Sequence, residues 1–106
     1  MADFREVADQ SEIPPGRSLA VRLGQFAIAI FNAAGKFVAL DSACLRCGCD
    51  ITSGTVAALE VTCPGCGWRY DLGSGRNIGV PKLRLDMFVV KTSGSKILVA
   101  DRFAAG

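Results

Sequence analysis

The sequence predicts an all-β domain, an antiparallel β-sandwich or barrel that carries a small metal-binding subdomain. Short apolar segments with strand-like alternation follow one another, separated by Gly, Pro and Ser turns, and no helical periodicity extends beyond a turn or two. Two C-x-x-C-G motifs interrupt this pattern in the middle of the chain. Since 106 residues suit one domain, we expect a single domain over 1–106 with the metal-binding subdomain at 41–75 inside it.

The expected strands are short and bounded by turn residues. A tight turn at Gly24 separates the first two, and Ala33 to Gly35 form the next turn. Ser93 to Ser95 form a hairpin turn near the end of the chain. We expect the apolar residues of these segments to form the core. The strand-like segments lie at 18–23, 26–31, 37–40, 55–62, 83–90 and 96–100.

The two cysteine motifs have the spacing of a metal site. Cys44 and Cys47 form the first C-x-x-C-G motif, Cys63 and Cys66 form the second, and 15 residues separate them. This spacing falls in the range of four-thiolate sites, and each loop is tight enough to aim two sulfurs at one point. Thiolates are soft ligands that suit zinc, iron or an iron–sulfur cluster and do not suit calcium or magnesium.

The absence of histidine narrows the chemistry further. With no imidazole in the chain, a metal held by side-chain nitrogen is excluded, and so is Ser-His or Cys-His catalysis. We find no phosphate loop and no nucleophile–base pair, so we expect no enzyme activity. The fifth cysteine, Cys49, has no obvious partner, although it is close enough in sequence to compete with Cys47 as a ligand.

Charge and hydropathy give no indication that the protein binds nucleic acids or membranes. The net charge is +2 and the charges are interspersed, which gives no case for a nucleic-acid or membrane-surface partner. No apolar run is long enough to span a bilayer, and the N-terminal residues lack the apolar core of a signal peptide. We expect a cytoplasmic protein, where reduced thiols favour metal binding over disulfides.

Several segments together resemble the Rieske-type [2Fe–2S] ferredoxin family. The segment C-P-G-C-G-W-R-Y-D at 63–71 is similar to the second cluster-binding loop of that family, and 37–41 is similar to the strand that leads into the first. The N-terminal segment 7–16, the turn at 73–75 and the final two strands also match. The resemblance implies a Rieske-like (ISP domain) antiparallel β-sandwich or barrel with a small rubredoxin-like metal-binding subdomain.

The metal ligands depart from the family pattern C-x-H…C-x-x-H. Arg46 occupies the first histidine position and cannot ligate iron as a guanidinium cation, so Cys47 is the nearest replacement. Cys66 occupies the second histidine position, which makes both motifs similar to the knuckles of rubredoxins and zinc ribbons. Cys49 matches a disulfide position of one branch of the family, but the partner position is Gly65, so that bridge cannot form.

Two hypotheses for the centre follow. In the first, the protein is a small electron-transfer protein whose [2Fe–2S] cluster has Cys44 and Cys63 on one iron and Cys47 and Cys66 on the other. Its potential should not respond to ligand protonation near neutral pH, because the titrating imidazoles are gone. In the second, the same cysteines hold a single tetrahedral Zn²⁺ or Fe ion. Zinc would make a structural or partner-binding module, and iron a rubredoxin-like carrier.

Four further residues are candidates for tuning the centre. By resemblance, Tyr70 is expected to hydrogen-bond a ligand sulfur, and Pro81 to lie in a loop that covers the cluster. Arg46 lies next to Cys47, where it could offset thiolate charge or remain a solvated surface cation. Trp68 is either a packing residue of the second loop or a contact for a partner. The resemblance also implies a redox protein partner: a reductase, an oxygenase or a nitrite-reductase-like component.

Overall fold

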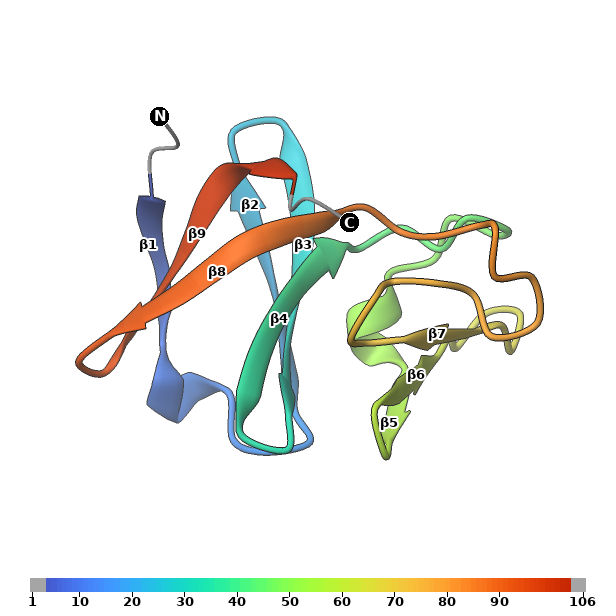
Figure 1. The fold of residues 1–106 in the computed structure, drawn as a ribbon, viewed down its shortest axis with the longest axis horizontal. Helices are drawn as coiled ribbons and strands as arrows, with labels where there is room; N and C mark the ends of the chain where they lie inside the picture. The colour runs from blue at the N-terminus through green and yellow to red at the C-terminus, as the bar shows by residue number, and fades with distance from the viewer. Residues whose placement is uncertain (1–3, 104–106) are drawn as a thin grey trace.

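The computed structural model describes residues 4–103, with side chains through residue 100, as two antiparallel sheets and two short 3₁₀ helices (Figure 1). Within that range no helix is long and apolar enough to cross a membrane. The strands are β1 (Phe4–Asp9), β2 (Ser18–Leu23), β3 (Phe26–Ala33), β4 (Lys36–Asp41), β5 (Thr55–Ala57), β6 (Glu60–Thr62), β7 (Arg69–Asp71), β8 (Met87–Ser93) and β9 (Lys96–Phe103). The helices are η1 (Gln10–Glu12) and η2 (Ile51–Ser53).

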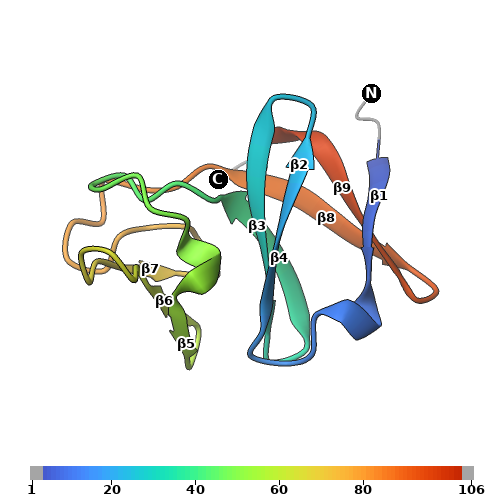
Figure 2. The ribbon, with the colours of Figure 1, turned by 180° about the vertical axis from the view of Figure 1, so that it is seen from behind.

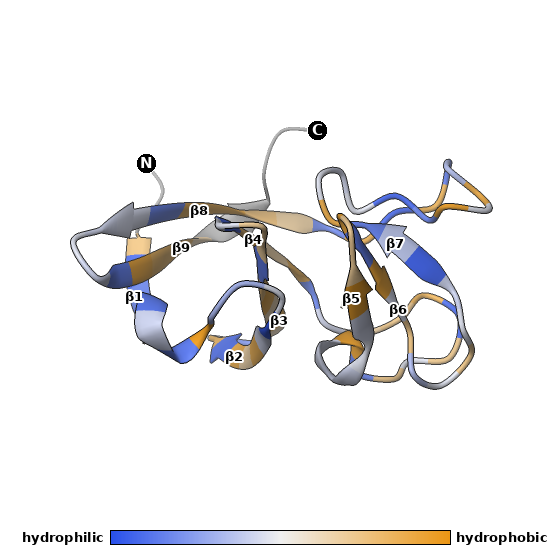
Figure 3. Ribbon diagram, turned by 90° about the horizontal axis from the view of Figure 1, so that it is seen from below, coloured by the Kyte–Doolittle hydropathy of each residue, from blue (hydrophilic) through white to orange (hydrophobic). Residues whose placement is uncertain are grey.

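The larger sheet has six strands in the order β1-β9-β8-β4-β3-β2. It curls strongly, so that the edge strands β1 and β2 approach each other in the view from below (Figure 3). The smaller sheet, in the order β5-β6-β7, lies beside one end of the larger one in both views (Figures 1 and 2). This architecture confirms the all-β prediction.

The apolar run at the start of β3 has a structural cause, because both faces of this strand are buried. Ile28 and Ile30 point into the core enclosed by the curled sheet. Ala29 and Phe31 point the other way, into a second core that the larger sheet shares with the smaller one. Alternate side chains of a strand leave opposite faces, so a strand buried on both faces reads as a continuous apolar run.

The second core ties the cysteine loops to the larger sheet. It contains Cys44 and Cys63, and all of its members are buried. Its other residues come from β3, β4, β6, β7, η2 and the loops that flank the smaller sheet: Ala29, Phe31, Ala33, Val38, Leu40, Ile51, Val61, Tyr70, Leu72 and Leu85. The bounds 41–75 for a metal-binding subdomain stay a prediction.

The predicted strand at 83–90 begins late, and the reason is a competing set of hydrogen bonds. The amide of Leu85 donates to the carbonyl of Gly75 at 2.8 Å, and the carbonyl of Leu83 accepts from the amide of Asn77 at 2.8 Å. Residues 83–85 therefore pair with the preceding loop, and β8 begins only at Met87. The sequence pattern also missed β7, which has three residues.

Candidate metal centre

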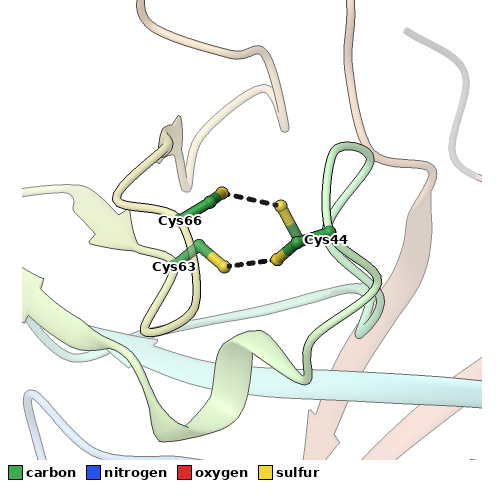
Figure 4. A group of neighbouring side chains, drawn as sticks. Cys44, Cys63 and Cys66 are labelled. Atoms are coloured by element: carbon green, nitrogen blue, oxygen red, sulfur yellow. Dashed lines mark hydrogen bonds between the residues drawn. The ribbon is translucent and has the colours of Figure 1, made fainter.

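The four cysteine sulfurs of the two motifs converge on one point. The Sγ atoms of Cys44, Cys47, Cys63 and Cys66 all lie within 4.8 Å of one another. The Sγ of Cys44 lies 3.7 Å from that of Cys66, and the Sγ of Cys47 lies 3.4 Å from that of Cys63. Figure 4 shows Cys63 and Cys66 on one loop pointing toward Cys44 on the facing loop. All five cysteines are free thiols.

The two loops have the same backbone turn. The amide of Gly48 donates to the carbonyl of Cys44 at 2.9 Å, and the amide of Gly67 donates to the carbonyl of Cys63 at 3.0 Å. Both glycines have positive φ, 77° and 81°. This left-handed conformation favours glycine because it has no Cβ, which explains the glycine after the second cysteine of each motif.

The amides inside each turn also point at the first sulfur. Those of Arg46 and Cys47 donate to the Sγ of Cys44. At the matching positions of the second loop, the amides of Gly65 and Cys66 donate to the Sγ of Cys63. Hydrogen bonds of this kind stabilise a thiolate, so both loops are prepared to present negative sulfur.

Strand pairing fixes where the loops lie. The first loop follows β4 and is closed by a bridge between Ala43 and Asp50. The second loop connects β6 to β7, and the amide of Cys63 donates to the carbonyl of Trp68 across its base at 2.7 Å. Each loop is therefore the tip of a hairpin-like structure.

Burial divides the centre into an inner and an outer side. Cys44 and Cys63 retain only 3% and 1% of their accessible surface. Cys66 is half-buried and Cys47 is exposed. Any ion held by the four sulfurs thus lies close to the surface on the side of Cys47 and is enclosed by the core on the other.

Tyr70 connects the core to the first loop. Its buried hydroxyl lies 3.3 Å from the Sγ of Cys44 and accepts a hydrogen bond from the amide of Leu45 at 3.1 Å. Burial, followed by the hydrogen bond to Cys44, raises the pKa of Tyr70, so the phenol stays protonated and donates to the sulfur. The contact expected from the sequence is therefore present in the structure.

Burial, hydrogen bonds and neighbouring sulfurs shift the pKa values of the thiols in opposite directions. Burial alone would raise the pKa of Cys44, but hydrogen bonds from Tyr70 and from the loop amides lower it to about 6. The pKa of Cys63 is raised, chiefly by burial. For Cys66, the hydrogen bond from the Trp68 amide lowers the pKa. Burial and the neighbouring sulfurs have the larger combined effect and raise the pKa of Cys66 to about 12. Adjacent thiols cannot all ionise unless a cation compensates their charge.

Arg46 and Trp68 lie together beside the loops. The guanidinium carbon of Arg46 is 5.5 Å from the centre of the Trp68 ring, which is the geometry of a cation–π contact. The indole is half-buried and packs against the core that contains Cys44 and Cys63. Packing therefore accounts for one side of Trp68. Roles for Arg46 and Trp68 in tuning the centre stay predictions.

The loop that carries Pro81 is held by a residue that the sequence patterns missed. Pro81 is exposed, and its carbonyl accepts from the guanidinium of Arg76 at 2.8 Å. Buried Asn77 accepts from the amides of Gly79 and Val80 through its Oδ1, at 2.9 and 2.8 Å. An Asn two residues before Gly is a recognisable turn signal. A covering role for Pro81 stays a prediction.

Cys49 lies close to the centre but outside the convergent set. A Cβ added to Gly65 would lie 2.5 Å from the Sγ of Cys49 and 3.1 Å from that of Cys47. The absence of a side chain at position 65 thus leaves the space that the Cys49 sulfur occupies. In the described part of the chain, the convergent group contains Cys47 and does not contain Cys49.

The fold and the cysteine loops define a Rieske-type protein: residues 3–100 match the Rieske [2Fe-2S] domain family, and the chain belongs to it. Among its relatives is the ferredoxin component of the naphthalene 1,2-dioxygenase system of Pseudomonas aeruginosa. The two are 26% identical over 89 residues, which cover 83% of this chain and 86% of the relative. The resemblance inferred from the sequence is therefore confirmed.

Solved structures share the fold over nearly the whole chain. The ferredoxin of carbazole 1,9a-dioxygenase from Nocardioides aromaticivorans IC177 has a TM-score of 0.86 at 24% identity, covering 93% of this chain and 98% of that chain. The putative small subunit of the NADH-dependent nitrite reductase from Mycobacterium tuberculosis has a TM-score of 0.87 at 19% identity, with 99% of each chain covered. These similarities confirm the Rieske-like fold.

The family implies an iron–sulfur cluster, and the residues present test that implication. A Rieske [2Fe–2S] centre carries two histidines on one of its irons, and this chain contains no histidine. The residues therefore do not fit the histidine-ligated cluster. The four convergent cysteines fit a centre ligated only by thiolates.

Proposed function

We propose that this protein is a small electron carrier whose redox centre is iron held by Cys44, Cys47, Cys63 and Cys66. The observation that carries the proposal is the convergence of four sulfurs within 4.8 Å on a Rieske frame. When bound, such iron supplies one-electron redox chemistry, and the protein supplies ligands, hydrogen bonds to sulfur and a route to the surface.

The environment of the sulfurs supports a carrier. Cys44 and Cys63 lie in the packed core, so the inner side of the centre has little freedom to rearrange when its charge changes. Cys47 is exposed, so a partner can approach that side closely. The proposal includes a cytoplasmic location, because thiols must stay reduced to bind iron.

The proposed partner is another redox protein, either a reductase that supplies electrons or an oxygenase or nitrite-reductase-like component that accepts them. Support comes from relatives whose names place them in such systems: a dioxygenase ferredoxin, and the small subunit of a nitrite reductase. The net charge of +2 is too small to specify a partner by long-range attraction.

Reversible reduction tests the proposed function. The iron-loaded protein should show a visible thiolate–iron absorption that bleaches with dithionite and returns on reoxidation, and a reversible one-electron wave in voltammetry. The potential should be flat with pH between about 6 and 9, because no ligand imidazole titrates there. Protein that binds iron without a reversible wave would contradict the electron-carrier proposal.

A redox-silent zinc module is the second candidate function. It is favoured by the two matched C-x-x-C-G turns, since zinc accepts the same four-thiolate cage. In that case the metal would stabilise the fold or a partner surface, and protein grown with both metals available would contain zinc and show no voltammetric wave.

A further inference from the structure

The separation of the sulfurs distinguishes one metal ion from a two-iron cluster. With metal–sulfur bonds of about 2.3 Å, the sulfurs of a tetrahedral site lie about 3.8 Å apart. Two such tetrahedra that share an edge of two sulfides form a [2Fe–2S] unit. Thiolates on its different irons then lie about 5.3 to 6.5 Å apart.

The observed sulfurs fit the single tetrahedron. The pair Cys44–Cys66 is 3.7 Å apart and the pair Cys47–Cys63 is 3.4 Å apart, both near the tetrahedral edge. In the two-iron arrangement expected from the sequence, each of these pairs would be divided between the two irons. Any other division of the four cysteines between two irons fails as well. It would need sulfurs at least about 5.3 Å apart, and no pair among the four is separated by more than 4.8 Å.

The backbone supports the same conclusion independently of the sulfur distances. The two loops carry the same turn and the same pair of amide-to-sulfur hydrogen bonds, from the second and third residues after Cys44 and after Cys63. Two loops with the same turn face each other and aim four thiolates at one point, which is the arrangement of a mononuclear four-thiolate site.

We propose that the four cysteines hold one tetrahedral ion rather than a [2Fe–2S] cluster, so that the chain combines a Rieske fold with a mononuclear four-thiolate centre. The inference rests on the proposed function only for the identity of the ion, because an electron carrier needs iron and not zinc. The number of metal ions follows from the geometry alone.

Metal and sulfide analysis of the full chain tests the inference. The protein should be produced with iron as the only added transition metal, purified without oxygen, and assayed for iron, zinc and acid-labile sulfide. One iron and no sulfide per chain is the expected result. Two irons and two sulfides would overturn the single-ion inference and leave the electron-carrier proposal intact. One zinc and no iron would support the single ion and overturn the carrier.

Cobalt titration of metal-free protein provides a readout that does not depend on iron loading. Binding of Co²⁺ should saturate at one equivalent per chain and show the intense absorption of tetrahedral cobalt thiolate. Saturation at two equivalents, or a spectrum without tetrahedral bands, would overturn the inference.

Two exposed cysteines of the first loop form a matched pair of variants. Cys47→Ser should weaken Co²⁺ binding at least tenfold and reduce the thiolate absorption, whereas Cys49→Ser should match the wild type. Since both side chains are exposed, neither change disturbs the core. Equal weakening by the two variants, or by Cys49→Ser alone, would overturn the assigned ligand set.

Discussion

The hydroxyl of Tyr70 contacts the centre and the backbone of the first loop at the same time. The hydroxyl donates to the Sγ of Cys44 and accepts from the amide of Leu45, and the whole Tyr70 side chain is buried. A donor to a ligating sulfur withdraws negative charge from the metal, and such contacts tune metal sites. Tyr70 therefore links the redox property of the centre to the packing of the core.

Tyr70→Phe should lower the reduction potential of the iron-loaded protein. The lost hydrogen bond stabilises the more negative, reduced centre more than the oxidised one, so its removal makes reduction harder, by roughly tens of millivolts. Voltammetry on wild type and variant measures the shift. An unchanged potential with a lower Tm would show that Tyr70 only supports the loop.

At the residue scale, the sequence predicted that the four cysteines of the two motifs converge, and it predicted their neighbours less well. The spacing of two C-x-x-C-G motifs already limits where Cys44, Cys47, Cys63 and Cys66 can point. Spacing could not separate Cys49 from Cys47, because both lie within reach in sequence, and the structure is needed to place the Cys49 sulfur over Gly65 of the other loop and outside the convergent group.

At the element scale, the turn at Gly75 joins the second cysteine loop to the larger sheet. Its φ is +78°, its amide donates to the carbonyl of Asp71, and its carbonyl accepts from the amide of Leu85. A Cβ at this position would lie 2.6 Å from the backbone oxygen of Leu85 and 3.4 Å from the side chain of Leu40. No side chain fits without moving backbone.

Gly75→Ala should destabilise the protein more than Gly94→Ala. Gly94 also has positive φ, +59°, but a Cβ there meets nothing within 4 Å. The control variant should lose only the cost of left-handed backbone, roughly 1–2 kcal/mol. Gly75→Ala adds overpacking of roughly 1–3 kcal/mol. Urea unfolding measures both, and equal losses would contradict the close approach at Gly75.

The start of η1 predicts a specific acid sensitivity. Asp9 accepts hydrogen bonds from the amide and hydroxyl of Ser11, and these contacts, with Lys96 and Ser95 contributing less, lower its pKa from 3.8 to about 2. A carboxylate whose pKa is lower in the folded state stabilises the fold above pH 3.8 and loses that contribution as pH falls through about 2.

Asp9→Asn should therefore flatten the fall in stability between about pH 4 and pH 2. Ser11→Ala removes one of the two donors and should give an intermediate slope. Chemical denaturation at a series of pH values measures the three slopes. A variant that loses stability with acid as steeply as the wild type would show that Asp9 is not responsible.

The bounds of a strand were predictable where apolar and polar residues alternate, and they were not predictable where hydrogen bonds to distant backbone set the end of the strand. β2 matches its predicted bounds, because a period of two over six residues identifies a strand with one buried face. β3 runs two residues beyond the prediction, to Ala33, where buried Asn32 donates to the carbonyl of Ile13 and accepts from the amide of Gly35. A polar residue satisfied by distant backbone has no signature in a hydropathy pattern.

At the scale of the whole molecule, the two cores differ in their dependence on the metal. The second core, which the two sheets share, contains Cys44 and Cys63, whereas the core inside the curled sheet contains no cysteine. Four thiolates held by one ion add a cross-link between two loops that otherwise meet through packing, the Arg46–Trp68 contact and the hydrogen bond from Leu45 to Tyr70, and such a link contributes directly to folding.

Metal removal should therefore loosen one part of the chain selectively. After chelation, amide hydrogen exchange should accelerate in residues 43–86, while β1, β8 and β9 stay protected. Far-UV circular dichroism should retain most of its β signal, and restored metal should reverse the exchange. Equal acceleration in both sheets would contradict two separable cores.

The uneven burial of the sulfurs sets a rule for how this carrier must work. Cys44 and Cys63 are enclosed by the core and Cys47 is exposed. The shortest electron-transfer route between the centre and the surface therefore runs through the side of Cys47, both for reduction and for oxidation. This asymmetry predicts that donor and acceptor use the same docking face in turn, so that the carrier dissociates between transfers. An excess of either partner should then slow turnover by occupying the shared face.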